Sequence, residues 1–131
     1  MPDLHLEFVS PESVLFSGDV DQVDVPGAEG DLGILAGHAP MVTALRPGII
    51  TIYRGNDRMP VVVMGGFAEV SPSGLTVLAD KAVAREDFDV ASLANDIRDT
   101  EEDVADCTDD AERDRLTRHL EQLKTLQAAL T

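Results

Sequence analysis

Basic and aromatic side chains are scarce in this sequence, and tryptophan is absent. Its 131 residues include 25 Asp and Glu against 10 Lys and Arg, which gives a formal net charge of −15. Because nucleic-acid binding requires a basic surface opposite the phosphates, this charge argues against a nucleic-acid partner. It also disfavours direct docking on anionic lipid. A partner that carries basic groups would instead be attracted.

The sequence also has only one cysteine, and it lacks the patterns of a signal peptide and of a membrane-spanning segment. Cys107 is the only cysteine, so the sequence has no disulfide framework and no multi-cysteine zinc site, which fits a reducing compartment. The N-terminal residues MPDLHLEFVS lack the basic start and apolar core of a signal peptide. No apolar run approaches the ~20 residues needed to cross a bilayer. We therefore expect no direct membrane insertion, and a place in the cytosol or on a membrane only through another protein.

The first two-thirds of the sequence has the pattern of a β protein. Hydrophobic residues make up 44% of the chain but aromatics only 4%, so we expect a core of Val, Leu, Ile and Ala. Alternating apolar residues predict a half-buried strand over 4–9, and β-branched residues predict another over 49–54. Further strands are expected over 13–17, 20–25 (with a bulge), 32–35, 41–45, 59–64, 67–70, 75–78 and 80–86. Roughly eight to ten strands with frequent turns indicate an antiparallel β-sandwich or flattened barrel over residues 1–86.

The pattern becomes helical from about residue 87. Residues 87–131 contain no glycine or proline, and apolar residues recur there at helical spacing. Asp87 or Asp89 is the expected N-cap of a first helix, and Asp109 with Glu112 has capping-box spacing for a second. One apolar stripe consists of Leu93, Ile97 and Val104 beside Ala94 and Ala105, and the other of Leu116, Leu120, Leu123 and Leu130, with Leu126 on its flank. We therefore predict an antiparallel two-helix hairpin over 87–131 that depends on docking against the sandwich.

A glycine-rich stretch from Val25 to Pro40 is the part of the chain best suited to contact a partner. It contains four of the ten glycines, and its pattern predicts a short strand between two sharply bent loops. Leu32, Ile34 and Leu35 would anchor this strand, leaving Glu29, Asp31 and His38 at the rim. A phosphate-binding loop is less well supported, because no lysine and Ser/Thr follow the last glycine. A hairpin with no role beyond folding is the alternative.

No pattern for catalysis, a cofactor or a metal is present. The sequence has no nucleophile elbow and no helical zinc-binding pair of histidines. His5 and His119 are expected at the surface, and His38 with two nearby carboxylates is too few ligands for a metal site. Paired carboxylates occur by chance in so acidic a chain, and aromatic residues that would line a sugar site are lacking. An enzyme is therefore the least supported class.

Several segments closely resemble the epsilon subunit of bacterial F-type ATP synthase. They are FVSPESVLFSGDVDQVDVPGAEGDLGILAGHAP, LRPGIITI, GGFAEV and TVLADKA, in family order along nearly the whole chain. The resemblance implies a non-catalytic rotor subunit of the central stalk that links the gamma subunit to the c-ring. It would support the coupling of proton flow to ATP synthesis on the cytoplasmic face of the bacterial inner membrane.

The resemblance also assigns residues to partners. In the family, the ring-facing loops match Glu29, Gly30 and Asp31 and the turn of Gly37, His38, Ala39 and Pro40. The ring loops carry basic residues, so Asp31 is expected to be an acidic contact. Individual contacts with gamma do not follow from the sequence.

A regulatory role of the helical tail is the alternative function that the resemblance implies. In some members the tail extends into the alpha/beta hexamer and inhibits ATP hydrolysis, and in some an Ile/Leu-Asp-x-x-Arg-Ala motif binds ATP. Here the aspartate is Asp89, but Ser92 stands where the motif has arginine and Leu93 where it has alanine. The sequence therefore predicts a helix cap rather than an ATP site, and a tail that inhibits weakly or not at all.

Overall fold

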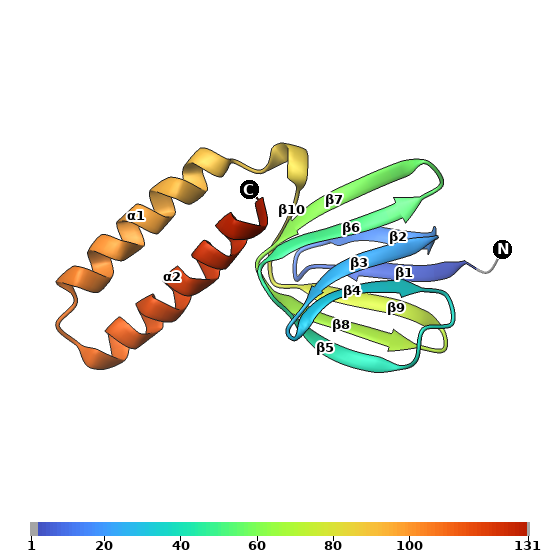
Figure 1. The fold of residues 1–131 in the computed structure, drawn as a ribbon, viewed down its shortest axis with the longest axis horizontal. Coiled ribbons are helices and arrows are strands. Elements are labelled where there is room, and N and C mark those ends of the chain that lie inside the picture. The colour runs from blue at the N-terminus through green and yellow to red at the C-terminus, as the bar shows by residue number, and fades with distance from the viewer. Residues whose placement is uncertain (1–2, 131) are drawn as a thin grey trace.

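The computed structural model describes residues 3–130, which form a ten-stranded β-sandwich followed by a helical hairpin (Figure 1). The predicted fold class is therefore confirmed. The first five strands are β1 (Leu4–Val9), β2 (Val14–Val20), β3 (Gln22–Gly27), β4 (Gly30–Leu35) and β5 (Met41–Leu45). The second five are β6 (Gly48–Arg54), β7 (Asp57–Val63), β8 (Gly66–Ser71), β9 (Gly74–Ala79) and β10 (Ala82–Ala84). A short 3-10 helix, η1 (Arg85–Asp87), leads into helices α1 (Val90–Asp106) and α2 (Asp110–Leu130).

The strands form two layers that share one hydrogen-bonded path (Figure 1). One layer has the order β10-β7-β6-β3, with β4 also paired to β3, and the other has the order β5-β8-β9-β1-β2. The layers are joined where Gly27 of β3 pairs with Leu45 of β5. Among the described strands, β1 and β9 run parallel and every other pair runs antiparallel.

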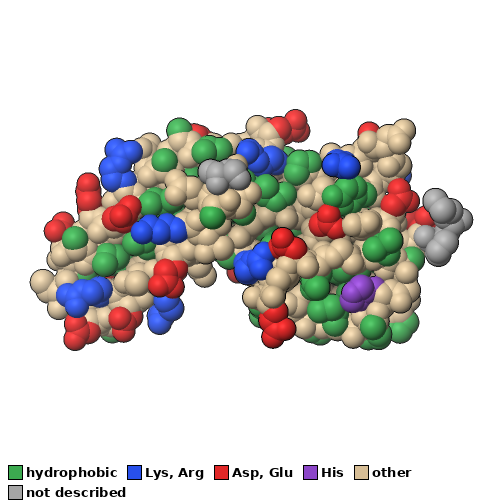
Figure 2. All heavy atoms as spheres, viewed as in Figure 1, with side chains coloured by type: hydrophobic (Ala, Val, Ile, Leu, Met, Phe, Trp, Pro, Cys, Tyr) green, Lys and Arg blue, Asp and Glu red, His purple; other side chains and the backbone are tan. Residues whose placement is uncertain are grey.

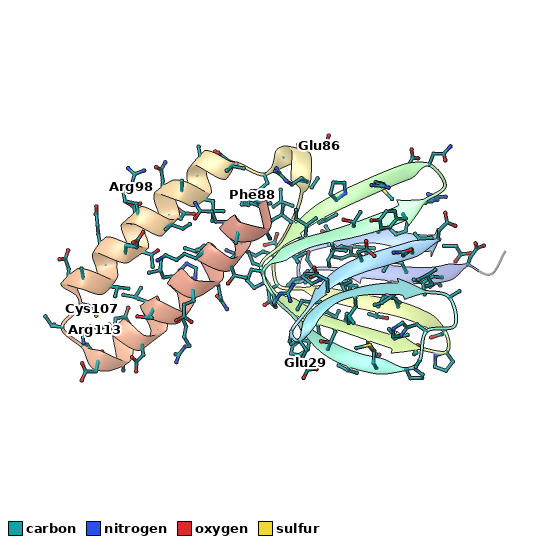
Figure 3. All side chains as sticks on the ribbon, in the orientation of Figure 1. Glu29, Glu86, Phe88, Arg98, Cys107 and Arg113 are labelled. Carbon is teal, nitrogen blue, oxygen red and sulfur yellow. The ribbon has the colours of Figure 1, made fainter. Side chains whose placement is uncertain are left out.

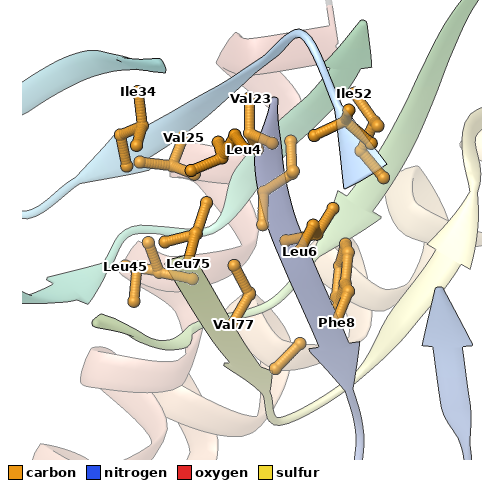
Figure 4. Packing of buried hydrophobic residues seen from close by; sticks show 14 of the residues in the cluster. Leu4, Leu6, Phe8, Val23, Val25, Ile34, Leu45, Ile52, Leu75 and Val77 are labelled. Carbon is orange, nitrogen blue, oxygen red and sulfur yellow. The ribbon is translucent and has the colours of Figure 1, made fainter. Parts of the chain in front are cut away.

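The core between the layers is almost entirely aliphatic, as the scarcity of aromatic residues predicted. Alternate residues of each strand point inward, as in β1, where Leu4, Leu6 and Phe8 are buried. Figure 4 shows these side chains packed with others from β3, β5, β6 and β9. Removing so many branched side chains from water stabilises the sandwich by about 1.5–3 kcal/mol for each one fully buried.

Two sequence predictions are wrong at positions where the chain changes layers or reaches an edge. Residues 20–25 were predicted as one bulged strand, but the chain bends at Asp21, so that Val20 ends β2 and Val23 lies in β3 of the other layer. The irregular register lies instead between Phe8 and Val9 of β1. Leu35, predicted as an anchor, is 52% exposed because it ends the edge strand β4.

The helical hairpin and β7 share a small second core. Leu93 and Ile97 of α1 pack with Leu123 and Leu126 of α2 and with Val62 of β7. Leu126 was predicted on the flank of its helix, but it is fully buried because that side of α2 faces the sandwich. Figure 1 shows that the two helices touch the sandwich near the start of α1 and the end of α2, while the connection between them points away.

The helix caps agree with the sequence. The Asp89 side chain accepts a hydrogen bond from the backbone N–H of Ser92 at 3.0 Å, which makes Asp89 the N-cap of α1. Asp87, the other candidate, lies in η1. Asp109 accepts from the N–H of Glu112 at 3.3 Å, as the capping-box spacing predicted.

Candidate functional site

The tip of the β3–β4 hairpin is a tight turn held firmly against the neighbouring strand. Ala28 and Glu29 form its two-residue loop, and a side chain at Gly27 would lie only 2.7 Å from the carbonyl oxygen of Gly30. The N–H of Ala28 donates to the carbonyl of Ala44 at 2.8 Å. Figure 3 shows Glu29 projecting from the end of the sandwich that lies nearer the helices. The tip is therefore exposed but rigidly positioned.

Asp31, next to this tip, is paired with an arginine from the end of β5. Its Oδ1 accepts from Nη2 of Arg46 at 2.5 Å, and the Asp31 side chain is 84% exposed. The backbone N–H of Arg46 donates to the carbonyl of Pro26 at 2.8 Å, which fixes the base of the arginine beside the hairpin. Asp31, the residue predicted as an acidic contact, is therefore already paired with Arg46 of the same chain.

The second predicted contact, the turn of residues 37–40, lies at the other end of β4. The N–H of His38 donates to the carbonyl of Leu35 at 3.2 Å, and its ring Nδ1 donates to the carbonyl of Ala39 at 2.8 Å. Gly37, Ala39 and Pro40 are exposed. These two hydrogen bonds mean that His38 helps to shape the turn.

The structure does not bring these two predicted groups together. Glu29 directly precedes β4, Gly30 and Asp31 begin it, and the turn of 37–40 follows its end. A six-residue strand separates its two ends by about 20 Å. A single small contact cannot include both groups, so the contact of each with a partner stays a separate prediction.

An exposed apolar row crosses the outer face of the layer that contains β5, β8, β9, β1 and β2. Phe67 pairs with Ala44 on one side and with Leu78 on the other, Leu78 pairs with Val9, and Val9 pairs with Val14. We call these five residues the apolar row. Phe67 is 57% exposed, Leu78 52% and Val14 64%. Five strands at ~4.8 Å spacing make the row about 19 Å long.

Sequence reasoning missed the apolar row. The signal was present in β8 and β9, where apolar residues stand at adjacent positions, as in Phe67-Ala68 and Val77-Leu78. Ala68 and Val77 are buried, so Phe67 and Leu78 must face outward. Val42, which is 65% exposed, extends the same face along β5. Large exposed apolar patches on a folded domain mark sites where another protein binds.

The positions of the altered ATP motif lie at the start of α1. Asp89 is committed to capping the helix, and Ser92 donates its backbone N–H to that cap. A cavity beside them, between the hairpin and β7–β10, is lined by Asp87, Asp89 and Asp96 together with Lys81 and His119. Three carboxylates face one lysine there, so the charge of this lining is unfavourable for a nucleotide phosphate.

A histidine on β1 lies between two carboxylates at the surface. His5 Nδ1 is 3.1 Å from Asp19 Oδ1, and His5 Nε2 is 2.8 Å from Glu7 Oε1. The hydrogen bond to Asp19, and then the one to Glu7, raises the pKa of His5 above its ordinary value of 6.5. Glu7 in turn has a lowered pKa because Ser17 and then His5 donate to it.

We predict that this cluster makes stability depend on pH near neutrality. Since the folded-state pKa of His5 is raised, its stabilising contribution is complete below about 6.5 and is lost as the pH rises through the raised value. The NMR titration midpoint of His5 should therefore lie above 6.5 in the folded protein, and Asp19→Asn should lower it. A midpoint at or below that of the urea-unfolded chain would contradict the assignment.

Within residues 3–130, no group of three or more His, Cys, Asp and Glu side chains is arranged to hold a metal ion. No helix in that part of the chain is long and apolar enough to span a bilayer.

A β-sandwich with an exposed apolar row, a rigid acidic hairpin tip and an appended helical hairpin defines a protein-docking module. Residues 3–85 match the family model described as ATP synthase, Delta/Epsilon chain, beta-sandwich domain. The ATP synthase epsilon chain of Rhodopseudomonas palustris is 50% identical over 130 residues, covering 99% of this chain and 96% of its own length. The chain therefore belongs to the epsilon-chain family of ATP synthase.

Solved structures show the same arrangement. A chain in the cryo-EM structure of the Euglena gracilis mitochondrial ATP synthase, which contains OSCP, F1 and the c-ring, superposes with a TM-score of 0.84 at 28% identity. It covers 100% of this chain and 83% of its own length. A chain from the central stalk and c-ring of the Tetrahymena thermophila mitochondrial ATP synthase superposes with a TM-score of 0.65 over 98% of this chain and 96% of its own. At 13% identity it shows the fold alone.

Proposed function

We propose that this chain is a non-catalytic rotor subunit of a proton-translocating F-type ATP synthase. The apolar row would bind the gamma subunit, and the tip at Glu29, Gly30 and Asp31 would contact the c-ring. The chain would then lie peripherally on the cytoplasmic face of the bacterial inner membrane and support the coupling of proton flow to ATP synthesis.

The observation that carries this proposal is the apolar row. In the isolated chain the aromatic Phe67 and the aliphatic Leu78 are exposed to water. Burying them against a partner would contribute about 25 cal/mol of binding free energy for each Å² of apolar surface. The row lies on a regular sheet whose other side is the sandwich core, so it is a rigid surface. A rigid docking surface suits a rotor subunit, because torque is transmitted only through contacts that do not yield.

The turn of Gly37, His38, Ala39 and Pro40 is proposed as a second contact. It lies at the end of the sandwich opposite the hairpin tip, beside the β8–β9 turn. We therefore propose that the two predicted groups meet different parts of the rotor surface.

Inhibition of ATP hydrolysis through the helices remains the alternative role, and the charge on the hairpin weighs against a strong effect. α1 contains six Asp and Glu and one Arg, and α2 contains four of each sign. Two of the arginines in α2 are already paired along the helix, Arg113 with Asp110 and Arg115 with Glu112. Figure 2 shows charges of both signs on the face of the hairpin in view. An acidic surface on the alpha/beta hexamer would therefore attract this tail weakly.

The test is to add the purified chain to ATP synthase depleted of this subunit, comparing full-length protein with residues 1–86. The main sandwich core contains no residue of the two helices, so we treat 1–86 and 87–131 as two domains. We expect both forms to restore proton-pumping coupling, with rates of ATP hydrolysis within about twofold of each other. Suppression of hydrolysis by the full-length chain alone would make the tail an inhibitor, and failure of both forms to bind would refute the rotor proposal.

A further inference from the structure

The ion pair between Asp31 and Arg46 has the features of a contact that can be exchanged. The Asp31 side chain is 84% exposed and that of Arg46 is 37% exposed. Ion pairs at such exposure contribute only about 0–1 kcal/mol, because water screens the charges and two side chains must be ordered. The hydrogen bond of Asp31 to Arg46 uses one carboxylate oxygen, Oδ1. Stability of the fold therefore does not require this pair.

The place of the pair is specific even though its energy is small. Backbone hydrogen bonds from Ala28 to Ala44 and from Arg46 to Pro26 hold the hairpin tip and the arginine at the seam between the two layers. The pair borders a groove of about 680 Å³ on the outer face of β3, β4 and β6. Small residues, including Gly33 and Gly48, form much of its lining, and the end of α2 closes its far side. A loop of another protein has room to enter beside Asp31.

We propose that Arg46 acts as an internal substitute for a cationic side chain of the c-ring, which replaces it on Asp31 when the rotor assembles. Charge supports a basic occupant, because the tip presents Glu29 and Asp31 on a chain of net charge −15. In the free chain Arg46 lowers the negative potential of the tip, and so it weakens the attraction for any cation that competes with it. This inference rests on the proposed function.

The two positions therefore have opposite effects on ring binding. Asp31→Asn removes the site for the incoming cation and should weaken the ring-dependent part of binding about three- to tenfold at low salt. Arg46→Gln removes the competitor and should strengthen it about two- to fivefold. In the Asp31→Asn background, Arg46→Gln should strengthen binding no more than the Arg54→Gln control does, because the specific competition acts through the Asp31 carboxylate.

The measurement compares the affinity of each variant for two acceptors, F1 depleted of this subunit and the complete ATP synthase depleted of it. Only the second contains the c-ring, so the ratio of the two dissociation constants isolates the ring contact. Arg54→Gln, which removes the same charge at the exposed end of β6, is the matched control and should show no dependence on Asp31. Circular dichroism would verify that each variant is folded.

The outcomes separate this inference from the rotor proposal. Equal ratios for wild type, Asp31→Asn and Arg46→Gln would overturn the exchange, although wild-type binding to both acceptors would still support the rotor function. Weaker ring binding in Arg46→Gln would also overturn it, because the arginine would then be a contact and not a competitor. Absence of wild-type binding to either acceptor would refute the rotor function itself.

Discussion

Phe67→Glu is expected to lower the affinity of this chain for F1 depleted of the subunit by at least about 100-fold. Phe67 is the one aromatic residue of the five in the apolar row, and it lies inside the row with Ala44 and Leu78 on its two sides. Central aromatic residues dominate the binding energy of protein interfaces, and their loss commonly costs 2 kcal/mol or more. A carboxylate at this position would in addition have to be desolvated among apolar groups.

The fold should tolerate this change. Phe67 is 57% exposed, so the isolated variant should unfold at nearly the urea concentration of wild type. Val83→Glu is the matched control, because Val83 is 43% exposed on β10 in the other layer and should bind F1 like wild type. The affinities would be measured by titration with a fluorescently labelled chain. If Phe67→Glu bound F1 with wild-type affinity, the apolar row would not be the gamma-binding surface.

Gly66→Ala is expected to destabilise the sandwich by about 3–5 kcal/mol, enough to unfold much of the protein. Gly66 has φ +137°, a conformation that residues with a side chain rarely adopt. An added methyl carbon would lie 2.0 Å from the carbonyl oxygen of Leu78, and a backbone atom cannot move aside as a side chain can. Gly66 pairs with Leu45 and Ala79 at once, so any shift disturbs two strand pairs.

Gly55→Ala is the comparison that measures the cost of backbone strain without a steric clash. Gly55 has φ +62° at the β6–β7 turn, and no atom lies within 4 Å of the position where its methyl carbon would be. Its substitution should cost only about 1 kcal/mol. Equilibrium urea denaturation of both variants provides the comparison. If Gly66→Ala lost no more stability than Gly55→Ala, the tight approach of β8 to β9 would not be a constraint on the fold.

Local patterns in the sequence were sufficient to predict the fold class and most of its elements. The alternation of Leu4, Leu6 and Phe8 specifies a strand with one buried face whatever surrounds it, because successive side chains point to opposite sides. The absence of glycine and proline after residue 87 and the caps at Asp89 and Asp109 specify two helices, since these signals act within a few residues of the chain. The exposed acidic tip at Glu29 and Asp31 was likewise predicted from the glycine-rich stretch around it.

Only the tertiary structure determined which of these features lie together. The apolar row requires Ala44, Phe67, Leu78, Val9 and Val14 to be aligned by the pairing of five strands, and the burial of Leu126 requires α2 to dock on Val62. The separation of Asp31 from His38 and the pairing of Asp31 with Arg46 also depend on strand register and on the seam between the layers. Periodicity fixes the face on which a side chain stands, but contacts between distant segments arise only when the whole core packs, and these contacts decide where a partner can bind.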